Sequence, residues 1–187
     1  MRGCFSVSLL GSLFFVLVLV PQPSAAQYVG VSKCRPCHLA VFKSWEQTRM
    51  AKAFELLKPG VAADAKKAHK LDPNKDYTAD PNCVSCHVIG FGRPGGFVSL
   101  EKTPTLVGVQ CEACHGVGGG YLKPNLMSLT NKEYKRSALV AAGMVMPSAE
   151  TCQTCHNQKS PFYKPFDYQT RLREGVHAHE PLKYKHD

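Results

Sequence analysis

The sequence contains the pattern Cys-x-x-Cys-His four times, and this repetition constrains the fold more than any other feature. The pattern is typical of c-type haem attachment, in which two thiols bond to the haem and the histidine binds its iron. Positions i, i+3 and i+4 lie on one face of a helical turn, so the three side chains of one motif can reach one haem together. The predicted attachment residues are Cys34, Cys37, Cys83, Cys86, Cys111, Cys114, Cys152 and Cys155, and the predicted proximal iron ligands are His38, His87, His115 and His156.

Two other uses of paired cysteines fit the sequence less well. Zinc sites use Cys-x-x-Cys pairs, but nothing about zinc requires a histidine after every pair. A disulfide framework would scatter its cysteines instead of repeating one fixed spacing. Eight of the nine cysteines belong to the four motifs, and the ninth is Cys4. We therefore expect four covalently bound c-type haems.

Residues 1–26 have the features of a cleaved secretory signal peptide. Arg2 supplies the positive charge, an apolar run extends from Leu9 to Val20, and small residues precede Gln27. The run is too short to cross a bilayer of ~30 Å as a helix. We expect a single tetrahaem domain over 27–187, in the periplasm, secreted or on the outer surface of a bacterium, with no integral membrane segment after cleavage.

The formal net charge of +9 does not predict nucleic-acid binding. No basic stripe is interleaved with aromatic residues, as a nucleic-acid surface would require. The propionates of the haems would offset much of the positive charge. The lysines that remain are suited to docking acidic partners, so we expect redox proteins as electron donors and acceptors.

The length of the domain limits its polypeptide core. Four haems share one domain of modest size, so porphyrins must form much of the interior. We expect a mainly α fold with extensive irregular loops, a compact haem-filled core and little or no sheet. Apolar residues at helical spacing predict one helix over 37–57 and a more polar helix over 61–71.

The rest of the domain shows shorter signals. Turn-forming residues predict a loop over 72–82. A short helix is expected over 132–142 with Asn131 as its candidate N-cap, and Ser148 is the candidate cap of the helix that carries the last motif. Prolines and aromatic residues from Ser160 onward predict an extended, irregular tail.

The residue on the far side of each iron decides between electron transfer and chemistry at that iron. His177 and His179 are the leading candidates for this distal position, either serving different haems or with only one of them ligating. Met50 is a third candidate: twelve residues beyond His38 on the same predicted helix, it could reach another iron or simply pack in the core. His69 lies in a basic, surface-like helix and is the weakest candidate, and His186 near the C-terminus is expected in solvent. These candidates do not supply four convincing distal ligands. Three explanations remain open: one of the weak candidates binds an iron, a neighbouring chain contributes a ligand, or one haem is five-coordinate.

With the motifs placed, most of the domain resembles the tetrahaem cytochrome c-554 family. The resemblance rests on the four motifs and on three further stretches, 45–54, 108–116 and 155–167. It implies a mainly helical protein with haems in closely stacked pairs that carries electrons outside the cytoplasm. It also implies mostly bis-histidine haems with one five-coordinate haem. Related multihaem chains often have a distal histidine where this sequence has Met50. Either the Met50 thioether replaces that histidine as the ligand, or the haem has no ligand from this position.

Electron transfer is the function that these patterns favour. It needs no general acid or base, because the protein supplies only spacing, ligands and dielectric. One alternative is a small redox enzyme that acts on a nitrogen oxide or hydroxylamine at an open haem. Another is a polymeric wire in which chains associate and exchange distal histidines. No acid–base cluster is evident, so we expect a carrier and assign no catalytic residue.

Overall fold

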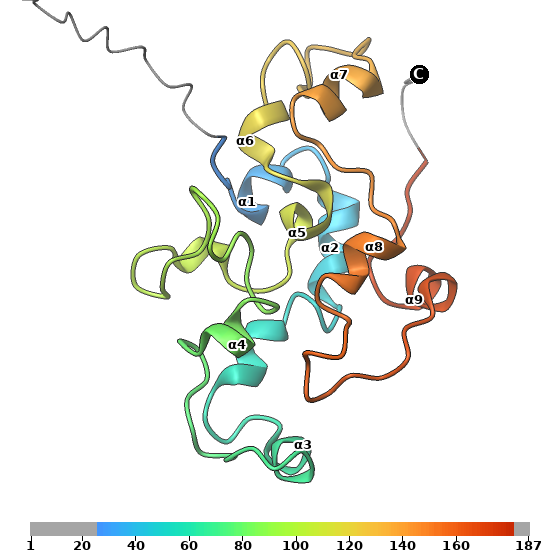
Figure 1. The fold of residues 1–187 in the computed structure, drawn as a ribbon. Coiled ribbons are helices and arrows are strands. Elements are labelled where there is room, and N and C mark those ends of the chain that lie inside the picture. Colours follow the sequence, from blue (N-terminus) through green and yellow to red (C-terminus); the bar gives the residue numbers. More distant parts are fainter. Residues whose placement is uncertain (1–25, 182–187) are drawn as a thin grey trace, which may run out of the picture.

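The computed structural model describes residues 26–181, which form a chain of short helices joined by long loops (Figure 1). No strand occurs among these residues, only the isolated bridges Val88–Val107 and Gly116–Met144. This confirms the expected mainly α fold with little or no sheet. The elements are α1 (Val31–Cys34), α2 (Leu39–Glu46), η1 (Ala53–Leu57, 3₁₀), α3 (Ala63–Ala68), α4 (Pro81–Val84), η2 (Pro104–Leu106, 3₁₀), α5 (Cys111–His115), α6 (Gly118–Tyr121), α7 (Arg136–Ala141), α8 (Ala149–Gln153) and α9 (Tyr168–Glu174).

The single helix predicted over 37–57 is wrong. Helix α2 ends at Glu46, and turns separate it from η1. The Thr48 hydroxyl donates to the Trp45 carbonyl at 2.7 Å and accepts from the Ala51 amide at 3.3 Å, which offers the backbone an alternative to continuing the helix. Met50 therefore does not share a helix with His38, contrary to the expectation from the sequence.

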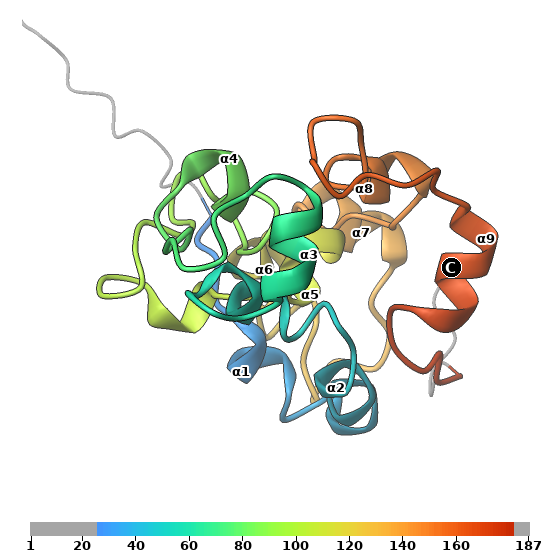
Figure 2. The same cartoon turned by 90° about the horizontal axis from the view of Figure 1, so that it is seen from below.

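The polypeptide core is small and surrounds the second motif. Ile89 and Val84, on either side of His87, are 0% and 1% exposed, and they belong to one apolar cluster. The other buried members of the cluster come from η1, η2 and the intervening loops: Phe54, Leu57, Tyr77, Val88, Phe97 and Leu106. Helix α4 lies next to η1. Figure 1 shows α3 and α7 at opposite ends of the molecule, and Figure 2 shows the same elements from below.

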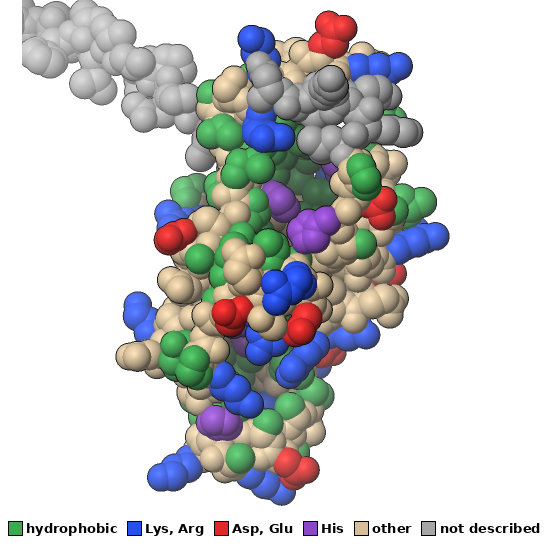
Figure 3. Space-filling model, turned by 90° about the vertical axis from the view of Figure 1, so that its right-hand side faces the viewer, with side chains coloured by type: hydrophobic (Ala, Val, Ile, Leu, Met, Phe, Trp, Pro, Cys, Tyr) green, Lys and Arg blue, Asp and Glu red, His purple; other side chains and the backbone are tan. Residues whose placement is uncertain are grey.

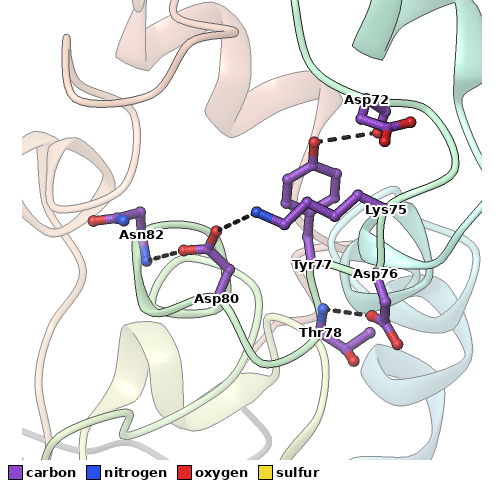
Figure 4. A network of polar contacts seen from close by, with 7 residues as sticks. All are labelled: Asp72, Lys75, Asp76, Tyr77, Thr78, Asp80 and Asn82. Carbon is purple, nitrogen blue, oxygen red and sulfur yellow. Dashed lines mark hydrogen bonds and ion pairs between the residues drawn. The ribbon is translucent and has the colours of Figure 1, made fainter.

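The predicted loop over 72–82 is ordered by local polar contacts and leads directly into the second motif (Figure 4). The Asp80 carboxylate caps α4 by accepting from the Asn82 amide at 3.0 Å, and it lies 3.6 Å from the Lys75 ammonium. The Tyr77 hydroxyl donates to the Asp72 carbonyl at 3.1 Å. Pro81, at the first position of α4, suits a site where no amide donor is needed.

Three expectations for the C-terminal half have different outcomes. Ser148 does form a capping box with Thr151 at the start of α8, as predicted. Helix α7 is shorter than expected, and Asn131 does not cap it, because its side-chain amide donates to the carbonyls of Asn125 and Leu126 instead. The tail is not wholly irregular, since it contains α9.

The other expectations concern smaller points. Helix α3 covers only the middle of the helix predicted over 61–71. No helix in the described part of the chain is long and apolar enough to cross a membrane. The predicted signal peptide, apart from Ala26, and His186 lie outside the described residues.

The cap of α4 generates a stability prediction. Replacement of Asp80 with Ala removes the acceptor of the Asn82 amide and should lower the free energy of unfolding by about 1 kcal/mol. Denaturant unfolding of the holoprotein measures the change. Replacement of Lys75 with Met keeps the cap but removes the partly exposed ion pair and the contact of the ammonium with the Tyr77 ring, and it should cost about 0.5 kcal/mol. Equal losses in the two variants would show that the cap contributes nothing.

Candidate haem-binding sites

Each Cys-x-x-Cys-His motif forms a helical turn, as the spacing predicted. The His38 amide donates to the Cys34 carbonyl, and the His156 amide to the Cys152 carbonyl, both at 3.0 Å. The third motif is itself a helix, α5. The turn of the second motif is tighter, because the His87 amide donates at 2.9 Å to the Val84 carbonyl, which is three residues earlier instead of four. In each motif the two thiols and the imidazole thus start from one turn.

Two of the predicted proximal histidines are oriented by backbone carbonyls. Nδ1 of His87 lies 2.6 Å from the Ala53 carbonyl oxygen, and the His115 ring is hydrogen-bonded to the backbone of Val145. A bond of this kind fixes the ring and leaves the other nitrogen available for a metal. His156 is held differently: its ring stacks on Phe166 with centroids 4.7 Å apart.

His87 and His115 are half-buried, whereas His38 and His156 keep more of their surface exposed, and in all four predicted proximal histidines the surroundings lower the pKa. Burial lowers the pKa of His87, and it is also the main cause of the lowered pKa of His38, His115 and His156. Neighbouring basic side chains add to the effect, namely His177 for His38 and His115, and Arg171 for His156. Neutral imidazole is the form that binds a metal, so the sites favour ligation at pH 7.

The attachment thiols of different motifs meet in pairs. The Cys34 and Cys111 thiols lie within hydrogen-bonding range, which raises the pKa of Cys34 and lowers that of Cys111. Cys86 and Cys155 make an equivalent contact, which lowers the pKa of Cys86 to about 6 and raises that of Cys155. The first motif therefore adjoins the third, and the second adjoins the fourth.

A longer-range electrostatic interaction, between Cys114 and Cys152, links the two pairs. Burial, followed by the charge of Cys152, raises the pKa of Cys114 to about 11. Cys114 is the second cysteine of the third motif, and Cys152 is the first cysteine of the fourth motif. The spatial order of the motifs is consequently first, third, fourth, second, which differs from their order in the chain.

The residues present fit c-type haem better than the two alternatives. All eight thiols in the described residues are free, so no disulfide framework is formed. Nowhere in residues 26–181 do three His, Cys, Asp or Glu side chains gather as a site for a bare metal ion, which argues against zinc. A cavity of about 430 Å³ also borders Cys114 of the third motif and Thr151 at the start of the fourth.

The structure brings His177 to the third motif. The ring centroids of His177 and His115 lie 6.4 Å apart, with an angle of 32° between the rings. Two imidazoles on opposite sides of one metal ion have ring centres ~6 Å apart, because each metal–nitrogen bond is ~2 Å long. The Ala178 amide donates to the Ser44 hydroxyl at 2.7 Å and holds this part of the tail against α2. Figure 3 shows histidine side chains gathered at a hollow on this face.

The other distal candidates are placed less favourably. The His179 ring lies 5.2 Å from that of His177 but is exposed. The Met50 carbonyl accepts from the Val109 amide at 3.1 Å, so Met50 lies beside the approach to the third motif. His69 is exposed at the end of α3, and its ring contacts Phe162 with centroids 4.5 Å apart.

Two residues of the site, Gln110 and Glu112, were not predicted from the sequence. Both are buried, at 5% and 3% exposed, and both accept hydrogen bonds from the segment that precedes the first motif. Polar residues beside or inside a Cys-x-x-Cys turn usually face solvent. No periodicity or spacing could have indicated that these two are buried.

The chain matches proteins of known type over most of its length. Residues 33–116 match the family model described as cytochrome c554 and c-prime. The sequence is 39% identical over 162 residues to cytochrome c-554 of Nitrosomonas europaea, which covers 83% of this chain and 69% of that protein. The fold is similar to the reduced state of cytochrome c554 from the same organism, with a TM-score of 0.74 and 35% identity over 87% of this chain and 90% of that one.

Helical Cys-x-x-Cys-His turns in a strand-poor, helical fold define a c-type cytochrome. Within that class, the chain belongs to the cytochrome c-554 family, which confirms the resemblance seen in the sequence. This membership supports electron transfer through c-type haem iron as the general activity.

Gly116, which directly follows His115, generates a prediction about the third motif. Its backbone has φ 77° and ψ −177°, a region open essentially to glycine alone. A Cβ at this position would also collide with the Gly143 carbonyl oxygen. Replacement of Gly116 with Ala should lower the free energy of unfolding by at least about 2 kcal/mol.

Gly143 is the matched control for this prediction. It has φ 98°, but a Cβ there would have no atom within 4 Å. Replacement of Gly143 with Ala should therefore cost about 1 kcal/mol through the backbone alone. Denaturant unfolding of both holoproteins measures the difference, and an equal or smaller loss in the Gly116 variant would contradict the packing described.

Proposed function

We propose that this protein is an electron carrier that relays electrons through four covalently bound c-type haems outside the cytoplasm. When bound, the haems supply one-electron chemistry between ferric and ferrous iron. The observation that carries the proposal is that the attachment thiols of the first and third motifs, and those of the second and fourth, meet in pairs, with the third and fourth motifs near enough to interact electrostatically. Haems attached at adjoining turns would lie close to one another, and a short separation is what electron transfer between them requires.

The chain's own residues have limited tasks in this function. Cysteines attach the groups, His38, His87, His115 and His156 serve as proximal ligands, and the folded loops hold the spacing. No residue is required to move a proton, so we assign no catalytic role. The predicted signal peptide supports a periplasmic or outer-surface location, and redox proteins are the expected donors and acceptors.

We further propose that His177 is the distal ligand at the third motif. Its ring distance from His115 and the anchoring of Ala178 on Ser44 support this assignment. His179 lies next to it on the exposed tail and remains a candidate for another haem, and His69 is retained as the weakest candidate. Met50 lies beside the third motif as well, so the two candidates can be tested against each other at one iron.

Reductive titration of the purified holoprotein tests the proposed function. Stepwise addition of a one-electron reductant, followed at the haem absorption bands, should consume four electrons per chain and reverse fully on reoxidation. Fewer electrons would contradict four haems. Sustained turnover of nitric oxide or hydroxylamine, with reductant consumed beyond this stoichiometry, would support the enzyme alternative.

Replacement of His177 with Ala tests the distal assignment. Loss of the second imidazole should convert one haem from low spin to high spin, because one axial position opens. Low-temperature electron paramagnetic resonance measures the change. If His177→Ala leaves the spectrum of the native protein unaltered, His177 does not ligate.

The neighbouring candidates provide the controls in the same measurement. Replacement of Met50 with Leu should change no haem spectrum if His177 occupies the third site, and Met50 then serves only in packing. A spectral change in that variant together with a silent His177 variant would assign the thioether instead. Replacement of His179 with Ala tests whether the exposed ring serves any haem.

A further inference from the structure

A buried carboxylate joins the first and third motifs. Both oxygens of Glu112 lie 3.1 Å from the Val29 amide, Oε2 accepts from the Gly30 amide at 2.8 Å, and Oε1 accepts from the Gly118 amide at 2.7 Å. Glu112 lies between the two cysteines of the third motif, whereas Val29 and Gly30 directly precede α1. Hydrogen bonds to a charged acceptor are stronger than those between neutral groups.

Gln110 extends the same contact by one residue. Its side-chain oxygen accepts from the Val31 amide at 2.6 Å, and its nitrogen donates to the carbonyls of Thr105 at 2.8 Å and Val107 at 2.7 Å. Together with Glu112, it binds three consecutive amides of the segment 29–31. Gly30 is buried and would otherwise lack a partner for its amide, at a cost of ~1–3 kcal/mol, whereas Val29 and Val31 are half-buried.

This clamp fixes the position of the first motif relative to the third. Helix α1 begins at Val31, where the clamp ends, and it carries Cys34 at its last position. Figure 1 shows α1 next to α5, and the Cys34 thiol is hydrogen-bonded to that of Cys111. Movement of the clamped segment would therefore change the separation of these two attachment points directly.

The charge of Glu112 also acts on both motifs. No ion pair to Glu112 is formed within residues 26–181. The Cys111 hydrogen bond, burial and then the charges of Cys111 and Glu112 raise the pKa of Cys34. In the third motif, the Cys34 hydrogen bond lowers the pKa of Cys111, whereas burial and the charge of Glu112 act in the opposite direction. A charge that is buried and unpaired is screened much less than one in solvent.

We propose that Glu112 is a positioning residue that holds the first and third motifs together and lowers the reduction potentials of the haems attached there. A negative charge stabilises ferric iron, which carries one more positive charge than ferrous iron. Buried charge near a haem is one of the means by which a protein adjusts its potential. The inference rests on the proposed function, because it requires haems at both motifs.

Replacement of Glu112 with Gln in the holoprotein tests the proposal. This change removes the charge and nearly preserves the shape. Spectroscopic redox titration should show the potentials of two of the four haems shifted upward, with the other two unchanged. Glu150→Gln is the matched control: Glu150 lies in the first turn of α8, two residues before Cys152, but is fully exposed. Its removal should shift no potential measurably.

The outcomes separate this inference from the proposed function. A haem count below four in the unmodified protein contradicts the function. Four haems with unchanged potentials in Glu112→Gln, or an equal shift of all four, overturn the inference. If the variant does not fold, hydrogen exchange of the unmodified holoprotein decides the positioning role: the amides of Val29, Gly30 and Gly118 should exchange slowly, and exchange at the rate of exposed loops would overturn the clamp.

Discussion

The contacts between thiols of different motifs are the constraint on which the rest of the structure depends. Cys34 meets Cys111, Cys114 lies near Cys152, and Cys155 meets Cys86. A group attached at one turn therefore adjoins a group attached at the next, although the motifs are far apart in the sequence. The segments between the motifs must bring them together in space, and long loops with short helices are suited to this.

The packing of the polypeptide follows from that constraint. One compact apolar cluster surrounds the second motif, where Ile89 and Val84 are almost fully buried. The other motifs are held more by polar and backbone contacts: Glu112 binds the segment before α1, Gly116 passes close to Gly143, and Ser148 caps α8. A domain that devotes much of its interior to porphyrin needs such local contacts, because it cannot rely on an extensive side-chain core.

Sequence reasoning identified the parts of the site that depend on local spacing. The four helical turns follow from the Cys-x-x-Cys-His spacing, the mainly α fold follows from the size of the domain and the helical spacing of its apolar residues, and the Ser148 cap follows from its position before the last motif. The break after Glu46 could not be predicted, because apolar spacing continues to Leu57 while the bend depends on Thr48 and on a hydrogen bond from Trp45 to the distant Val109. The burial of Glu112 and the order of the motifs likewise depend on contacts between remote segments, which no local pattern records.

Mass spectrometry of the exported protein, with mapping of its cysteines, tests most directly whether the adjoining thiols are haem attachment points. The account predicts a chain heavier by four haem groups, with every motif cysteine in a thioether bond and none available to an alkylating reagent. Disulfides between Cys34 and Cys111 or between Cys86 and Cys155, or alkylated motif cysteines in the mature protein, would contradict it.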